Sequence, residues 1–285
     1  MRNLAEHNIT DSVINTFANA KDARVKAILT SLVKHLHAFI KDVNLTETEW
    51  MAGIQFLTAT GQMCDDKRQE FILLSDTLGA TTTKDLINHR KPEGMTEYTI
   101  FGPFYRDGAP DLPLGASIAG ETPGETVIVS GRVFAPGGVP LANALLDVWQ
   151  SDSEGFYDVQ LPDAPLNLRG RFRADAEGRY TFRTLKPAYY PIPTDGPVGK
   201  MLMAVGRHPY RPAHIHFIAA AAGYKPLTTE LFVDGDPYLD SDAVFGVRDS
   251  LVVDFVRHDS ADEAGQHGVT TPFYTVNYDF VLEPA

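Results

Sequence analysis

The sequence is poor in cysteine, because Cys64 is the only one among 285 residues. An intramolecular disulfide is therefore impossible, and zinc sites built from several cysteine ligands are excluded. A metal ion in this protein would have to be bound by histidine, tyrosine or carboxylate side chains.

The sequence also lacks long apolar runs and blocks of basic residues. No run approaches the ~20 apolar residues that span a bilayer, and residues 1–30 lack the apolar core of a signal peptide. The net charge is -12, which opposes the clustered positive charge that nucleic-acid binding requires. We therefore expect a cytoplasmic protein with no membrane insertion and no nucleic-acid partner, whose substrate is a small molecule.

The first part of the chain, residues 10–89, has the apolar periodicity of α-helices. Thr46 and Glu49 form the pattern of a capping box, which predicts a helix over residues 46–63. A further helix is predicted over residues 67–78, and the glycine that follows would end it.

After Pro92 the sequence changes to short apolar runs separated by glycine and proline. These runs cover residues 126–133, 144–150, 179–185, 214–219, 228–233, 250–256 and 273–282. Short strands at this spacing are typical of a β-sandwich. We predict a mainly β protein with a helical N-terminal domain (1–90), a connecting segment (91–123) and a β-sandwich domain (124–285) whose loops carry the chemistry.

Two histidines, His214 and His216, lie one residue apart in an alternating apolar run. In a strand they project from one face, while Ile215 and Phe217 project from the other. Two imidazoles that converge on one point are typical of a metal site, although a pair of ordinary strand histidines is the alternative. His35 has the same spacing from the next histidine, but in a helical run, where residues i and i+2 do not face each other.

Oxygen donors for such a site are available on two loops. Tyr157 follows an apolar run and the turn SDSEG, and Tyr189 and Tyr190 lie between two prolines. Taken alone, each tyrosine is more typical of a packed aromatic residue than of a ligand. Two phenolates together with two imidazoles would instead favour Fe(III) over Fe(II).

These segments together resemble the intradiol ring-cleaving dioxygenases, most closely the members that act on hydroxyquinol (1,2,4-trihydroxybenzene). The resemblance covers most of the chain and is carried by three segments, VSGRVFAPGGVPLANALLDVWQSDSEGFYD, PAYYP and RPAHIHF. In the first segment the matching residues are Gly131, Gly138, Leu141, Asp147, Gly155 and Tyr157.

The resemblance implies one non-haem ferric ion, Fe(3+), per subunit, bound by Tyr157, Tyr190, His214 and His216. It also implies catalytic roles for Tyr190 and for Arg211, whose guanidinium would stabilise charge on the substrate. A surface ion pair is the alternative for Arg211. Glu230 departs from the glutamine that many members carry at this position, and its role is left open.

The resemblance further implies a substrate pocket drawn from several segments. Its residues would be Leu73, Asp76, Ile100, Phe101, Gly102, Pro103, Phe104, Pro191, Ile192, Pro193, Arg211 and Val244. Asp76 is the informative one, because an acid could accept a hydrogen bond from a third ring hydroxyl and so reject catechol. An aspartate that faces water near the start of a helix is the alternative.

The expected reaction is intradiol cleavage of hydroxyquinol by O2 to 3-hydroxy-cis,cis-muconate, the enol form of maleylacetate, in aromatic catabolism. A homodimer through the N-terminal helices, with phospholipid in an apolar channel, is also implied, although plain helix packing explains the apolar stripe over residues 25–40 equally well. The alternatives are cleavage of catechol or chlorocatechol, a noncatalytic β-sandwich binding module, and a zinc hydrolase that adds Asp234 or Asp236 to the histidine pair.

Overall fold

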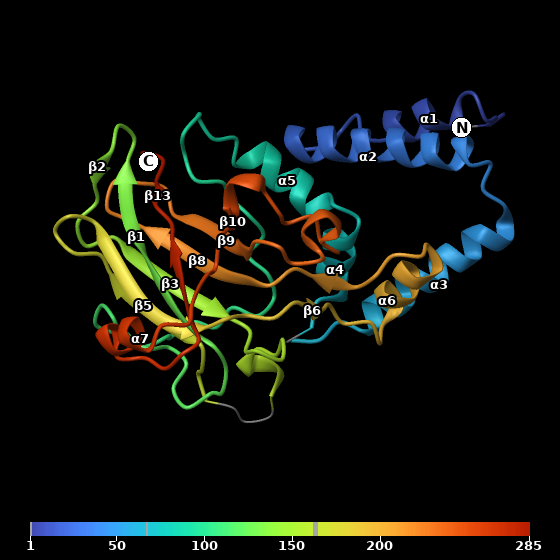
Figure 1. Ribbon diagram of the computed structural model, residues 1–285. Helices are drawn as coiled ribbons and strands as arrows, with labels where there is room; N and C mark the ends of the chain where they lie inside the picture. The colour runs from blue at the N-terminus through green and yellow to red at the C-terminus, as the bar shows by residue number, and fades with distance from the viewer. Residues whose placement is uncertain (1, 67, 162–164) are drawn as a thin grey trace. The chain divides into compact units, whose positions relative to one another are not determined.

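A computed structural model describes residues 2–66, 68–161 and 165–285 of the chain (Figure 1). The chain forms two compact units, Met1–Gln62 and Met63–Ala285. The first unit is helical and the second holds all the strands, which confirms the predicted combination of a helical N-terminal region and a β-sandwich. Among the described residues, no helix has both the length and the apolar character needed to cross a bilayer.

The first unit consists of α1 (Ile9–Asn15), α2 (Ala23–Asp42) and α3 (Glu47–Gln62). At the start of α3 the Thr46 N–H donates to the Glu49 carboxylate (2.9 Å), and the Glu49 N–H donates to the Thr46 hydroxyl (3.3 Å). This capping box satisfies N–H groups that have no partner within the helix. The helix predicted over residues 46–63 is thereby confirmed to within one residue at each end.

The apolar stripe of α2 lies on the surface of this unit. No residue of α2 is buried, and the side chains of Leu32 and Phe39 are 57% and 52% exposed. An apolar face of this kind is unusual for a surface that only meets water.

The second unit contains two sheets that face each other. The first sheet has the order β11 (Val256–His258), β12 (Phe273–Asn277), β1 (Thr126–Ala135), β13 (Phe280–Val281), with β2 (Val139–Pro140) and β5 (Arg179–Leu185) also paired to β1. The second has the order β10 (Val252–Val253), β9 (Leu227–Val233), β8 (His214–Ala220), β3 (Leu145–Gln150), β4 (Arg169–Arg173). A separate two-stranded ribbon pairs β6 (Tyr190–Pro191) with β7 (Tyr210–Arg211).

The core lies between the two sheets. Val127 and Val129 of β1 and Phe182 of β5 meet Phe217 of β8 and Leu146 of β3 in one fully buried apolar cluster. Every second residue of β1 is buried, as expected for a strand with one face on a core. Strands β8 and β9 are buried on both faces over most of their length. Polar side chains on the face that points away from the core are therefore also inside the protein and not in water.

Helices α4 (Glu70–Thr77) and α5 (Ala80–Asn88) belong to the second unit. The Arg207 guanidinium donates to the carbonyls of Thr77 and Ala243, and the Thr82 hydroxyl donates to the Val244 carbonyl. These bonds attach both helices to the sheet unit. The predicted helix over residues 67–78 begins at Glu70 and ends before Gly79, and Lys67 lies outside the described residues.

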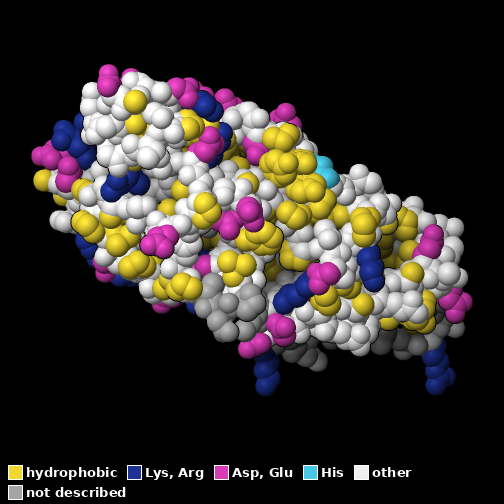
Figure 2. Space-filling view, turned by 60° about the horizontal axis from the view of Figure 1, so that its bottom comes forward, with side chains coloured by type: hydrophobic (Ala, Val, Ile, Leu, Met, Phe, Trp, Pro, Cys, Tyr) yellow, Lys and Arg dark blue, Asp and Glu magenta, His cyan; other side chains and the backbone are white. Residues whose placement is uncertain are grey.

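The described residues of this unit also form α6 (Pro197–Ala204) and α7 (Ala261–His267), together with the short 3-10 turns η1 (Asp158–Gln160), η2 (Leu239–Ser241) and η3 (Asp249–Leu251). The compact units divide at residue 62, whereas the domain boundaries at residues 90 and 123 stay a prediction. On the face shown in Figure 2, acidic and basic side chains are interspersed among apolar ones.

Candidate active site

The register of the second sheet brings three polar and aromatic side chains side by side. His216 of β8 lies opposite Trp149 of β3 on one side and opposite Glu230 of β9 on the other. The Trp149 and His216 rings stack with centroids 4.6 Å apart and planes 3° from parallel. His214 projects from the same face of β8, so both imidazoles are buried in the same place, as the strand pattern predicts.

Four donor atoms from three segments converge beside this strand. The Nε2 atoms of His214 and His216 are 3.0 Å apart, and the Tyr157 hydroxyl lies 3.3 Å and 3.1 Å from them. The Tyr190 hydroxyl lies 3.5 Å from both the Tyr157 hydroxyl and His214 Nε2. Donors that each lie about 2 Å from one ion are separated by roughly 3 Å, so this spacing suits a single metal ion.

The two histidines are present in the form that binds metal. His214 Nδ1–H donates to the Pro212 carbonyl (2.7 Å), which leaves Nε2 with its lone pair toward the donor cluster. Burial, followed by the charge of Arg211, lowers the pKa of His214 to about 3. Burial and the neighbouring His214 hold the pKa of His216 well below its usual value. Both rings are therefore neutral near pH 7.

The close approach of Tyr190 to Tyr157 depends on the absence of a side chain at Gly155. Gly155 has a φ of +89°, and a Cβ atom there would lie 2.8 Å from the Tyr190 Cβ, so a larger residue would displace Tyr190 from Tyr157. Burial raises the pKa of both phenols, and for Tyr190 the charge of Arg211 partly offsets this effect. Only a strongly charged metal ion would deprotonate phenols in such a place, and hard phenolate donors suit an oxidised ion.

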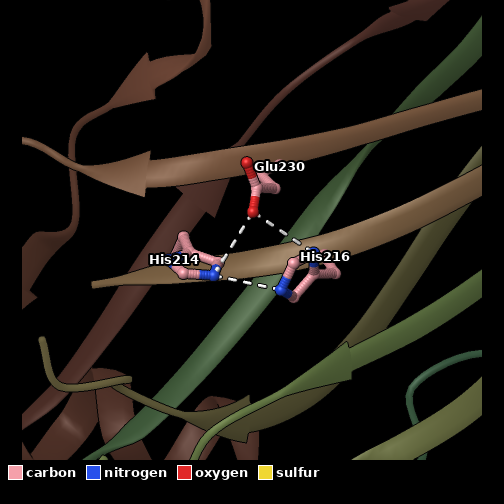
Figure 3. A group of neighbouring side chains, drawn as sticks. All are labelled: His214, His216 and Glu230. Carbon is pink, nitrogen blue, oxygen red and sulfur yellow. Dashed lines mark hydrogen bonds and ion pairs between the residues drawn. The ribbon is translucent and has the colours of Figure 1, made fainter. Parts of the chain in front are cut away.

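Glu230 offers a different donor set with the two histidines (Figure 3). Its Oε1 atom lies 3.4 Å from His214 Nε2, but it approaches His216 at Nδ1, also 3.4 Å away, and Nδ1 is the ring nitrogen opposite the donor cluster. Both carboxylate oxygens already accept from Arg211, at 2.8 Å and 3.2 Å. Glu230 is therefore engaged by Arg211, while the two phenols complete the donor cluster.

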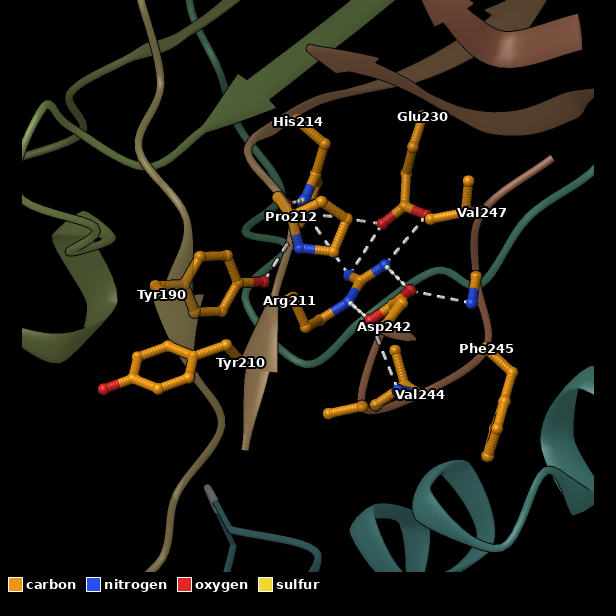
Figure 4. Close-up of polar contacts among 12 residues, drawn as sticks. Tyr190, Tyr210, Arg211, Pro212, His214, Glu230, Asp242, Val244, Phe245 and Val247 are labelled. Carbon is orange, nitrogen blue, oxygen red and sulfur yellow. Dashed lines mark hydrogen bonds and ion pairs between the residues drawn. The ribbon is translucent and has the colours of Figure 1, made fainter. Parts of the chain in front are cut away.

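Arg211 lies beside the donor cluster and is fully buried (Figure 4). Strand pairing places it opposite Tyr190 in the ribbon of β6 and β7. Its Nη1 atom is 3.2 Å from His214 Nε2. Coulombic attraction to Asp242 and Glu230 outweighs burial and raises the pKa of Arg211 well above its usual value, so the side chain is a permanent cation. The surface ion pair considered for Arg211 is not what the structure shows.

An apolar cluster of predicted pocket residues adjoins the site. Ile100, Ile192 and Val244 are buried together, and Leu73 packs against them. Phe104 stacks on Tyr157, with ring centroids 4.6 Å apart, and the Gly102 Cα faces the His216 ring so closely that an added Cβ would lie 3.4 Å from it. Phe101 is 42% exposed and contacts the Trp149 ring, Pro103 and Pro191 are exposed, and Pro193 is half-buried.

Asp76 is buried in α4, which sets aside the alternative of an aspartate facing water. Burial raises the pKa of Asp76, while a hydrogen bond from Thr81 and the charge of Arg211 lower it. The carboxyl group of Asp76 is therefore within the electrostatic influence of Arg211.

The chain matches two protein families along most of its length. Residues 100–284 match the family described as Dioxygenase, and residues 22–96 match the catechol dioxygenase N terminus. The chain belongs to the intradiol dioxygenase family. It is 50% identical to a 6-chlorohydroxyquinol 1,2-dioxygenase of Cupriavidus pinatubonensis (100% of this chain, 99% of that one) and 49% identical to a hydroxyquinol 1,2-dioxygenase of a Rhizobium species (97% and 95%). The solved structure of a hydroxyquinol 1,2-dioxygenase from Pseudomonas putida superposes with a TM-score of 0.93 at 50% identity, covering 98% of this chain and 99% of that one.

In this intradiol dioxygenase the acids considered for a zinc hydrolase are used elsewhere. Asp236 accepts from the N–H groups of Ala213 and Tyr238, and Asp234 is exposed. Within the described part of the chain, Glu230 is the only acid that groups with the two histidines.

Two residues of the intradiol dioxygenase site were missed by the sequence patterns. Trp149 stacks on His216, and Asp242 accepts from Arg211 at 3.2 Å and 3.3 Å. Trp149 could have been found by pairing the predicted strand over residues 144–150 with the one over residues 214–219. No pattern in the sequence indicated Asp242.

Proposed function

We propose that this protein cleaves hydroxyquinol by intradiol addition of O2, using one ferric ion per subunit bound by Tyr157, Tyr190, His214 and His216. The product would be 3-hydroxy-cis,cis-muconate, the enol form of maleylacetate. The observation that carries the proposal is the convergence of two phenol oxygens and two imidazole nitrogens within 3.5 Å of their neighbours.

The four donors would hold a ferric ion, which would supply the Lewis-acid and redox chemistry that makes the aromatic ring reactive toward O2. The overall reaction adds one O2 to the triol, so both oxygen atoms enter the product and no external reductant is required. One carbon–carbon bond breaks, between the two carbons that carry the adjacent hydroxyls.

The side chains of this protein would manage protons and charge. Tyr190 would accept a phenolic proton from the substrate, since its hydroxyl lies beside His214 in the donor cluster and its strand pairs with that of Arg211. Arg211 would donate a hydrogen bond to the substrate oxygen on which negative charge develops. The apolar cluster around Ile100 and Val244 would exclude water from the ring.

Substrate choice would rest on Asp76, whose buried carboxyl group would accept a hydrogen bond from the third ring hydroxyl. The names of the two relatives and of the solved structure, which refer to hydroxyquinol or its chlorinated form, support the triol over catechol. Catechol or chlorocatechol as the main substrate is the alternative.

An absorption spectrum of the purified protein, paired with an iron assay, tests the proposal. Tyrosinate bound to Fe(III) gives a broad visible band, so we expect a coloured protein whose band shifts when hydroxyquinol is added without O2. Admitting O2 should then yield maleylacetate and consume one O2 per triol. A colourless protein that holds zinc, or a coloured one that acts only on catechol, would contradict the proposal in different ways.

The proposal includes a homodimer joined through the N-terminal helices, with phospholipid at that contact, and a cytoplasmic location. The exposed apolar side chains of α2 support the dimer, because a second copy would cover them. Sedimentation of the protein measures whether it is a dimer, and lipid extraction from it measures whether phospholipid is bound.

A further inference from the structure

The Arg211 guanidinium is held by two carboxylates that come from different segments (Figure 4). Glu230 of β9 accepts from Nη1 (2.8 Å) and Nη2 (3.2 Å). Asp242, which directly follows η2, accepts from Nε (3.2 Å) and from Nη2 (3.3 Å). All three side chains are at most 3% exposed.

These contacts account for every N–H group of the guanidinium. Arginine has five N–H donors in a rigid planar fork. Four of them meet the two carboxylates, and the fifth, on Nη1, points to His214 Nε2 at 3.2 Å. The carboxylates of Glu230 and Asp242 thus leave a single N–H of Arg211 directed at the donor cluster.

The two acids also change what Arg211 contributes electrostatically. The guanidinium shares its positive charge with the two carboxyl groups that accept from it. Arg211 in this arrangement is an oriented hydrogen-bond donor, whose effect depends on the direction of one N–H more than on its net charge.

Asp242 has a second set of bonds, to the loop that follows it. Its Oδ1 atom accepts from the Val244 N–H (3.3 Å) and its Oδ2 atom from the Gly246 N–H (2.8 Å). Val244 is buried in the apolar cluster that adjoins the site. A Cβ atom at Gly246 would lie 2.7 Å from Arg211 Nη2 and 3.0 Å from Asp242 Oδ2, so the loop closes directly on the guanidinium.

We propose that Asp242 is a positioning residue that sets both the direction of the Arg211 N–H and the wall of the ring pocket at Val244. One carboxylate links a charged group beside the donor cluster to an apolar group beside the substrate ring. This inference rests on the proposed function for its catalytic readout, but the loop bonds can be tested without catalysis.

The test compares the iron-loaded Asp242→Asn protein with the wild type, and uses Asp240→Asn as the control. Asp240 is an exposed acid two residues away, so its loss changes the same charge with no contact to Arg211. For Asp242→Asn we expect kcat on hydroxyquinol to fall about 10- to 100-fold, as for other residues that orient an active-site group. The iron content and the visible band should persist, and the control should behave as the wild type does.

Hydrogen exchange of the metal-free proteins gives the second readout. The Val244 and Gly246 amides should exchange faster in Asp242→Asn than in the wild type, because their acceptor is weakened. Unchanged exchange at both amides together with an unchanged kcat would overturn the inference. Loss of iron from the variant would also overturn it, because Asp242 would then support metal binding and not Arg211.

Gly246→Ala provides an independent variant if Asp242→Asn does not fold. The added methyl group displaces Arg211 while both carboxylates remain, so we expect a fall in kcat with the iron retained. A fully active Gly246→Ala protein would contradict the inference. Failure of the proposed function is separate, because in that case the wild type itself would not act on hydroxyquinol.

Discussion

Removal of the Asp76 carboxylate should weaken the preference for hydroxyquinol over catechol. Asp76 is 7% exposed, and burial raises the pKa of its carboxyl group while a hydrogen bond with Thr81 and the charge of Arg211 lower it. When catechol is bound, no third hydroxyl reaches the carboxylate, and leaving a buried acceptor unsatisfied costs about 1–3 kcal/mol. Because every ~1.4 kcal/mol is tenfold, the preference attributable to Asp76 is roughly 5- to 140-fold.

The measurement is the ratio of kcat/KM for hydroxyquinol to that for catechol in the wild type and in Asp76→Ala. The ratio should fall by about that factor, because Asp76→Ala removes the cost of an unsatisfied carboxylate with catechol and the hydrogen bond to the third hydroxyl with hydroxyquinol. Ser75→Ala is the matched control, since Ser75 also bonds to Thr81 (2.8 Å) but carries no charge. An unchanged ratio in Asp76→Ala, or the same fall in Ser75→Ala, would refute the assignment of substrate choice to the carboxylate.

Three further outcomes follow from the geometry of the donor cluster. Tyr157→Phe or His214→Ala should lose iron and the visible band together, as measured by iron assay and absorbance, and a fully loaded, active variant would disprove the ligand set. Gly155→Ala should shift the visible band and lower thermal stability, because its Cβ meets Tyr190 at 2.8 Å, and an unshifted band would show that the phenol does not move. The metal-free protein should lose stability as pH falls from about 6.5 toward about 3, since the unfolded chain protonates His214 in that window whereas the folded one does not. His216 adds to this loss of stability, because burial lowers its pKa as well. The urea concentrations at the unfolding midpoint, compared at pH 7 and pH 5, measure the loss. Equal midpoints at the two pH values would contradict the prediction.

Local patterns in the sequence were sufficient for most of the elements. The α3 helix has a capping box of two residues three apart, so its start is encoded within one turn. Each of the seven apolar runs contains strand residues, because β-branched and aromatic side chains fit the pleated, half-buried surface of a sheet. The β4 strand was not predicted, since RGRFR offers only Phe172 to the core and is a strand by virtue of its pairing with β3.

The candidate site was predictable where strand geometry or family resemblance applied. Alternation along β8 places His214 and His216 on one face, which is a local property of the chain. The partners of Arg211 were beyond such reasoning, because Glu230 and Asp242 reach it from segments 19 and 31 residues further along the chain. Their meeting depends on sheet register and loop closure, which no pattern within either segment specifies.

The parallel stacking of Trp149 on His216 gives this protein an optical reporter of its own. The sequence has two tryptophans, and the other, Trp50, lies in α3. A Trp50→Phe protein would emit from Trp149 alone, whose indole stacks on one of the imidazoles proposed to hold the metal. A bound ferric ion should quench that emission, so filling and emptying of the site could be followed by fluorescence, with neither substrate nor oxygen present.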